Sequence, residues 1–266
     1  METDVYVQVK SSIKRILKID LENYKVEQMH RRLDSWLARS KVVTWKDYFQ
    51  LISTDAMEFE RFRNYLTINV TEFFRDQARW ETLRLEILPY LMKNSTQNRS
   101  PRGLKIWSAG CSVGKEAYSL AMLMAELTSQ YSLLATDMDR GALIQARAGG
   151  PYTQDEIRNL SDVQRKKYFS PTEPYFISEK LKTKIRFEEQ DLFSEQFDHN
   201  FDLIVCRNVV IYFTAEAKDK LYEKFSDALA PGGVLFMGGT EIISGASKYG
   251  LQNFGVSFYK KTPKTG

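Results

Sequence analysis

The chain has 266 residues, a formal net charge of +4 and 43% hydrophobic residues, which is ordinary for a globular protein of about two domains. It shows no signal-peptide core and no apolar run as long as a membrane span, so we expect a cytoplasmic protein without direct membrane insertion. Cys111 and Cys206 lack metal-ligand spacing and are interpreted as small buried apolar residues, so no metal site is expected.

Residues 1–68 are predicted to form an N-terminal helical domain. Helical periodicity covers roughly 3–18, 22–39, 44–53 and 55–68, with Asp20 and Thr44 as helix starts. The second predicted helix is basic, and three of its cations recur every seven residues beside its apolar stripe: Lys25, Arg32 and Arg39. This pattern is typical either of a solvated face or of a docking surface for an acidic partner, and the residues alone leave both open.

The glycine-rich loop after the first predicted strand is the best indication of a ligand site. A short apolar strand from Leu104 to Trp107 runs into this loop, and an amphipathic helix follows from Ala117. Strand, glycine turn and helix in that order are typical of the first crevice of a doubly wound, Rossmann-like α/β sheet. Gly110 and Gly114 allow a tight turn and a close approach to a ligand, although such loops also occur as ordinary strand-to-helix turns.

The acidic residues around this loop indicate which ligand it would hold. A second strand, residues 131–137, ends in Asp137, which could accept both hydroxyl hydrogens of a ribose. Either Asp137 or Asp139 could cap the helix that begins near Arg140; we assign the cap to Asp139 and the ribose to Asp137. Glu116 would repel a pyrophosphate at the helix N-terminus. It suits a cationic amine or sulfonium, so S-adenosylmethionine fits where NAD does not.

The rest of the chain completes the predicted α/β domain, residues 69–266, in which 69–103 form a linker and lead-in helix. Residues 201–206 read as a buried parallel strand, 229–236 as a helix end, a Pro-Gly-Gly turn and a further strand, and 255–259 as an antiparallel edge strand. Two short runs, 175–177 and 184–187, are predicted to form a small antiparallel β-subdomain inserted at about 168–189.

Four segments resemble the signature blocks of the CheR family, the chemotaxis receptor glutamate methyltransferases. They are 69–75 (NVTEFFR), 107–112 (WSAGCS), 135–137 (ATD) and 206–213 (CRNVVIYF). They follow one another in order across nearly the whole chain, and the first and last are specific. The resemblance implies a class I fold that transfers a methyl group from S-adenosylmethionine to receptor glutamates, forming 5-O-methyl esters for sensory adaptation and leaving S-adenosylhomocysteine. Val113, Lys115 and Ala117 depart from the family pattern, in which Thr, an acid and Pro are usual.

The resemblance also implies roles for individual residues. Arg75 would pair with the methionyl carboxylate of the cofactor, unless it is simply a surface arginine, and Tyr212 would shape the substrate pocket or hydrogen-bond the incoming carboxylate. Glu116 would meet the cofactor's amine. The complete set of expected cofactor contacts is Asn69, Thr71, Arg75, Gly110, Glu116, Asp137, Asp191, Leu192, Arg207 and Asn208. Asp191 and Leu192 would frame the adenine. Arg207 and Asn208 would lie beside the methyl group or merely cap the strand end.

In the resembled family the docking partner is the cytoplasmic helical region of methyl-accepting chemotaxis receptors. We therefore expect a monomer that is recruited to membrane receptor clusters chiefly through its basic helix, with no nucleic-acid partner. A glutamate acceptor is already ionised at neutral pH and needs no general base, which agrees with a chain whose two histidines lie outside every signature block. The alternatives are a methyltransferase for another substrate and a non-catalytic S-adenosylmethionine-binding regulator.

Overall fold

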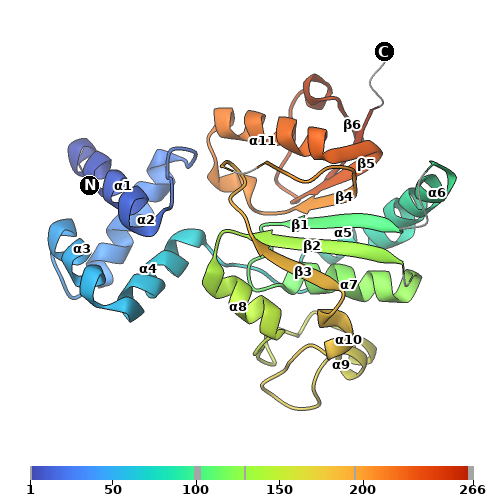
Figure 1. Ribbon diagram of the computed structural model, residues 1–266, viewed down its shortest axis with the longest axis horizontal. Coiled ribbons are helices and arrows are strands. Elements are labelled where there is room, and N and C mark those ends of the chain that lie inside the picture. The colour runs from blue at the N-terminus through green and yellow to red at the C-terminus, as the bar shows by residue number, and fades with distance from the viewer. Residues whose placement is uncertain (1, 99–102, 129, 195, 263–266) are drawn as a thin grey trace. The chain divides into compact units, whose positions relative to one another are not determined.

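The computed structural model describes residues 2–98, 103–128, 130–194 and 196–262, and it divides into two compact units (Figure 1). The first unit comprises Met1–Ile68 and Tyr212–Lys220, and the second comprises Asn69–Ile211 and Leu221–Gly266. Within the described ranges, no helix combines the length and the apolar character that crossing a membrane requires.

Four helices build most of the first unit: α1 (Thr3–Leu17), α2 (Val26–Arg39), α3 (Trp45–Thr54) and α4 (Ala56–Thr67). Thr44 is the N-cap of α3, as predicted, and its hydroxyl accepts the Asp47 N–H at 3.2 Å. The predicted start at Asp20 is wrong, because α2 begins only at Val26. Asp20 instead accepts the Glu22 N–H at 2.9 Å and pairs with Lys14 at 2.6 Å, so it closes a turn rather than capping a helix.

An aromatic cluster fills the interior of the helical unit. The Trp36 ring on α2 lies 4.5 Å from the Tyr65 ring and 5.5 Å from the Phe62 ring, both on α4. The segment Tyr212–Lys220 joins this unit through an isolated antiparallel bridge between Tyr24 and Phe213, whose rings are 5.1 Å apart. The helical unit therefore takes in the end of the last signature block.

The second unit is built on a seven-stranded sheet in the order β3-β2-β1-β4-β5-β7-β6. Strands β1 to β5 are parallel, β7 runs antiparallel to β5, and β6 runs antiparallel to β7. Because β1 lies between β2 and β4, the strand order reverses there, which is the point where doubly wound folds bind ligands. The bounds are β1 (Leu104–Ala109), β2 (Tyr131–Asp137), β3 (Ile185–Glu189), β4 (Phe201–Cys206), β5 (Leu229–Met237), β6 (Leu251–Gly255) and β7 (Phe258–Lys261). The predicted fold class is confirmed.

Helices cover both faces of this sheet, with α7 (Lys115–Leu127) and α11 (Ala215–Ala228) on opposite sides (Figure 1). Neighbouring residues of β1 point to opposite faces. Ile106 joins the core cluster that includes α7, whereas Trp107 lies 5.6 Å from Phe225 of α11. The remaining helical elements are α5 (Gln77–Thr82), the π turn η1 (Leu83–Ile87), α6 (Leu88–Asn98), α8 (Arg140–Ala148), α9 (Asp162–Tyr168), α10 (Glu179–Lys182), and the 3-10 turns η2 (Val210–Tyr212) and η3 (Ala246–Tyr249).

The prediction of a small antiparallel β-subdomain is wrong for its second run, residues 184–187. That run lies in β3, the edge strand of the main sheet, where Ile185 pairs in parallel with Leu133 of β2. Between residues 152 and 177 the antiparallel pairing consists of the isolated bridges Tyr152–Tyr175 and Phe169–Ile177. A short amphipathic run gives the same alternation in either setting, so its partner strand could not be read from the pattern.

Two predictions near the C-terminus need adjustment. Residues 255–259 span the turn between β6 and β7, so two antiparallel strands replace the single expected edge strand. The Pro-Gly-Gly turn lies inside β5 rather than before it. The β4–β5 register shifts there, since Phe201 pairs with Leu229 but Leu203 pairs with Val234.

Candidate functional site

The carboxyl ends of four parallel strands meet at one edge of the sheet and carry most of the predicted cofactor residues. Gly110 follows β1, Asp137 ends β2, Asp191 follows β3 by two residues, and Arg207 follows β4 directly. In open α/β sheets ligands bind outside these ends. We therefore take this edge, which we call the carboxyl edge, as the candidate site.

The glycine loop turns back sharply onto the end of β2. The N–H groups of Gly110 and Cys111 both donate to the Thr136 carbonyl, at 2.8 and 2.9 Å. Gly110 has φ +84°, and a Cβ at this position would come within 2.6 Å of a Val209 methyl group. Only glycine allows the loop to approach Val209 this closely.

The two aspartates after β2 have different surroundings. Asp139 is the N-cap of α8 and accepts the Ala142 N–H at 3.0 Å, which confirms the predicted cap. Asp137 accepts the Ser112 N–H at 2.7 Å and the Asp139 N–H at 2.9 Å. Burial raises the pKa of Asp137 to about 6, although both backbone donors favour the ionised carboxylate. The two donors hold the Asp137 carboxylate at the tip of β2, where a ribose would lie.

Glu116 lies in the first turn of α7 and is buried, with its Oε1 accepting the Ser108 hydroxyl at 2.8 Å. Burial raises the pKa of Glu116 to about 7, while Arg207 and the Ser108 hydrogen bond act in the opposite direction. A nearby cation would stabilise the ionised form of this buried carboxylate, because its positive charge would offset the lost hydration.

Two arginines carry positive charge into the same region. Arg207 is buried beside two aromatic rings, with its guanidinium carbon 4.7 Å from the Phe236 centroid and 5.7 Å from that of Trp80. It forms a 3.7 Å ion pair with Asp76, and its Nε is buried without a hydrogen-bond partner among the described residues. Arg75 is half-buried and donates to the Val70 carbonyl at 3.3 Å.

Glu241 was not identified from the sequence as a site residue, although it follows β5 at the carboxyl edge. It is 4% exposed, and its carboxylate accepts three backbone N–H groups, from Gly238 at 2.7 Å, Asn208 at 2.8 Å and Ile211 at 3.3 Å. Burial raises the pKa of Glu241. Asn208 has φ +60°, so Glu241 holds the left-handed turn that follows β4. An acid just beyond the carboxyl end of a parallel strand was the available signal.

The remaining predicted cofactor residues lie around this edge. Asn69 donates to Asp139 at 2.5 Å and accepts from the Ser112 hydroxyl at 2.9 Å, so its side chain ties segment 69–75 to the glycine loop. Thr71 contributes its backbone carbonyl to Lys115 at 3.3 Å. The Asp191 carboxylate closes its own turn by accepting the Phe193 N–H at 2.9 Å, and the adjacent Leu192 is buried.

The predicted docking residues of α2 differ in their surroundings. Arg32 is half-buried; its guanidinium donates to the Tyr65 carbonyl and lies 4.4 Å from the centre of that ring. Arg39 is exposed and donates to Ser35 at 2.5 Å. Lys25 precedes α2, and its N–H donates to the carbonyl of Tyr212 at 2.9 Å. Arg32 thus ties α2 to α4, whereas Arg39 presents its charge to solvent.

The residues at the carboxyl edge fit S-adenosylmethionine. Gly110 allows the tight turn after β1, Asp137 offers carboxylate oxygens for ribose hydroxyls, and Glu116 supplies negative charge for an ammonium group. The buried Nε of Arg207 has no hydrogen-bond partner in the part of the chain that the structure describes, so it could donate to an acceptor on a ligand. Oppositely charged groups for both ends of an amino-acid tail therefore lie near the end of β1.

Comparisons with known proteins agree with this geometry. Residues 4–67 match the family model "CheR methyltransferase, all-alpha domain", and residues 69–257 match "CheR methyltransferase, SAM binding domain", where SAM is S-adenosylmethionine. The chain is 41% identical to a chemotaxis protein methyltransferase of Listeria monocytogenes over 97% of both chains, and 40% identical to that of Listeria innocua over the same shares. It is 32% identical to a probable chemotaxis protein methyltransferase of Rhizobium etli, over 92% of this chain and 95% of the relative.

These matches confirm the predicted cofactor, S-adenosylmethionine, and the resemblance noted in the four sequence segments. They also agree with a helical unit preceding a doubly wound sheet. The chain therefore belongs to the CheR methyltransferase family.

Proposed function

We propose that this protein transfers a methyl group from S-adenosylmethionine to glutamate side chains of chemotaxis receptors, forming 5-O-methyl esters. The relatives' names supply the link to chemotaxis, and the chain matches them over nearly their whole length. In this proposal residues 1–68 capture the receptor, and residues 69–266 bind the cofactor and carry out the transfer.

The observation that carries the choice of acceptor is that neither histidine is among the residues that form the carboxyl edge. His199 lies just before the amino end of β4, so it is at the end of the strands opposite to the carboxyl edge. Its carbonyl accepts a hydrogen bond from Lys105 at 2.7 Å. His30 belongs to α2 in the helical unit, with its ring 4.0 Å from that of Tyr6. An amine or hydroxyl acceptor usually needs a base such as histidine, whereas a carboxylate is ready to attack at neutral pH.

The proposed roles follow from the charges at the edge. Glu116 would hold the cofactor's ammonium group, Arg75 its carboxylate and Asp137 its ribose, while Arg207 and Asn208 would lie beside the reactive methyl group. When bound, the cofactor would supply an electrophilic methyl group on its sulfonium, and its leaving group, the neutral thioether S-adenosylhomocysteine, needs no acid assistance. Catalysis then rests mainly on alignment of the two reactants, which can supply about 7–11 kcal/mol.

The acceptor side of the site is assigned to Tyr212 and to the basic face of α2. Tyr212 would shape the substrate pocket or hydrogen-bond the incoming carboxylate. Arg39 is the best candidate for attracting an acidic receptor helix, because it is exposed on α2. Attraction of this kind mainly raises the association rate and weakens with salt.

The test is incubation with methyl-labelled S-adenosylmethionine and receptor-bearing membranes, followed by treatment with alkali. Carboxylate esters release volatile labelled methanol in base, whereas N-methyl groups stay on the protein. Labelled methanol from receptor is the expected result. Alkali-stable label would favour a methyltransferase for another acceptor, and cofactor binding without any transfer would favour a non-catalytic regulator.

A further inference from the structure

Lys115 is a buried cation in an unfavourable place. It is the first residue of α7 and is only 5% exposed. At a helix N-terminus a positive charge is opposed by the helix dipole, and burial removes its hydration. A buried ammonium group persists there only if it is paired and hydrogen-bonded, so its partners indicate what it is retained for.

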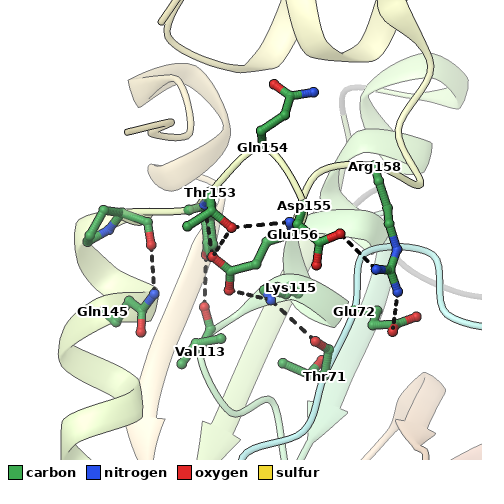
Figure 2. Close-up of polar contacts among 12 residues, drawn as sticks. Thr71, Glu72, Val113, Lys115, Gln145, Thr153, Gln154, Asp155, Glu156 and Arg158 are labelled. Carbon is green, nitrogen blue, oxygen red and sulfur yellow. Dashed lines mark hydrogen bonds and ion pairs between the residues drawn. The ribbon is translucent and has the colours of Figure 1, made fainter. Parts of the chain in front are cut away.

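Those partners belong to two segments that are distant in sequence. Figure 2 shows the Lys115 ammonium between the Glu156 carboxylate, at 2.7 Å, and the backbone carbonyl of Thr71, at 3.3 Å. The ammonium also lies 5.8 Å from the centre of the Tyr152 ring. Lys115 thus joins the start of α7 to the loop after α8 and to segment 69–75.

Glu156 is itself held on both oxygens. Its Oε1 receives Lys115, and its Oε2 accepts the Thr153 N–H at 2.8 Å and the Thr153 hydroxyl at 3.1 Å (Figure 2). Burial alone would raise the pKa of Glu156, but the hydrogen bonds from Lys115 and Thr153 lower that pKa below its ordinary value. The Glu156 carboxylate is therefore held in its ionised form beside Lys115.

The carbonyl that Lys115 binds is adjacent in sequence to the carbonyl that accepts a hydrogen bond from Arg75. Arg75 donates to the Val70 carbonyl at 3.3 Å, and Lys115 donates to the carbonyl of Thr71, the following residue. Movement of the backbone at Thr71 would therefore change the support of the Arg75 guanidinium. Asn69, at the start of this segment, already contacts the glycine loop through Ser112.

We propose that Lys115 and Glu156 are positioning residues, which hold segment 69–75 in the conformation that binds S-adenosylmethionine. The inference rests on the cofactor binding of the family and not on the proposed glutamate acceptor. Lys115 has a complementary partner in Glu156, and this pair joins the first turn of α7 to the loop between α8 and α9.

A second ion pair between the same two regions provides a matched control. Arg158 pairs with Glu72 at 3.2 Å, but both side chains are largely exposed, at 57% and 44% (Figure 2). Solvent screens such pairs, and most contribute little. If any link between these segments sufficed, removing Arg158 would act like removing Lys115.

The experiment compares Lys115→Met, Glu156→Gln, their double variant, Lys115→Arg and the control Arg158→Met. Calorimetry gives the Kd for S-adenosylhomocysteine, and hydrogen exchange in the ligand-free protein reports on the amides of residues 69–75. We expect Lys115→Met and Glu156→Gln each to raise Kd about tenfold and to speed exchange in this segment, with the double variant no worse than either. Lys115→Arg should recover most of the affinity, and Arg158→Met should stay within about twofold of the parent protein.

Two results would overturn the proposal. One is unchanged Kd and unchanged exchange of residues 69–75 in Lys115→Met and Glu156→Gln, even if thermal stability falls. The other is an equal loss of affinity in Arg158→Met. Because neither readout involves the acceptor, a protein that esterifies no receptor yet shows the expected Kd changes would refute the proposed function and leave the positioning role intact.

Discussion

Replacing Glu116 by Gln should make the ligand-free protein more stable and its cofactor binding weaker. Burial raises the pKa of Glu116 from about 4.5 in an unfolded chain to about 7, and the residue is 8% exposed. This difference corresponds to about 3 kcal/mol of destabilisation by the ionised group. Gln keeps an oxygen for the Ser108 hydroxyl but carries no charge, so it removes the penalty without leaving that donor unpaired.

The pH window of the effect follows from the two pKa values. Below about pH 4.5 the carboxyl is protonated in both states and the penalty is absent. Between about 4.5 and 7 the unfolded chain loses its proton first, so the free energy of unfolding falls as pH rises. Above about 7 the penalty is constant. Urea denaturation should therefore show a gain approaching 3 kcal/mol for Glu116→Gln at pH 8 and a much smaller gain at pH 5.

The same residue should couple cofactor binding to protons. An ammonium group beside Glu116 favours the ionised carboxylate, so binding of S-adenosylhomocysteine should release protons and should tighten between pH 6 and 7.5. Calorimetry in two buffers of different ionisation enthalpy measures this release, and it should be smaller for Glu116→Gln. The reasoning is refuted if the variant matches the parent protein at pH 8 in both unfolding free energy and affinity.

Three further predictions concern the glycine loop, Arg75 and the basic helix α2. Gly110→Ala should lower the free energy of unfolding by about 1 kcal/mol or more in urea, because φ is +84° and the new Cβ would meet Val209 at 2.6 Å. Arg75→Ala should raise the cofactor Kd about 10- to 100-fold by calorimetry, since in the proposed site it would remove a charged hydrogen bond to the cofactor's carboxylate. Arg39→Glu should raise KM for receptor in low salt and less so in high salt, with cofactor Kd unchanged; Arg15→Glu, the same charge change on exposed α1, should not.

The parts of the fold that depend on local sequence were predictable. Thr44 and Asp139 were recognised as N-caps because a cap acts within three residues of the chain. The residues at the carboxyl edge, apart from Glu241, were predictable for a related reason. Parallel strands are continuous apolar runs, so the polar residues that follow them, such as Asp137 and Arg207, must meet at one edge.

Contacts between distant segments were not predictable. Arg32 and Arg39 recur at the same spacing beside one apolar stripe, yet Arg32 donates to the Tyr65 carbonyl on α4 and Arg39 faces solvent. Periodicity gives the face of a helix, but not the element that packs against it. The strand at 184–187 was misplaced for the same reason, and nothing near Lys115 in the sequence pointed to Glu156, 41 residues away.

The buried charges at the carboxyl edge connect stability to cofactor binding. Burial raises the pKa of both Glu116 and Glu241 and lowers the pKa of Arg207, so folding disfavours the charged form of each group. Glu241 offsets this cost with three backbone hydrogen bonds. Glu116 accepts the Ser108 hydroxyl and is influenced by the charge of Arg207, but within the described ranges it forms no ion pair with a cation. A bound ammonium group would supply that cation. Fixed charges arranged before the ligand arrives need little reorganisation when it binds. The stabilisation of the protein by a saturating cofactor analogue should therefore be larger at pH 7.5 than at pH 6, and this pH dependence should shrink in Glu116→Gln.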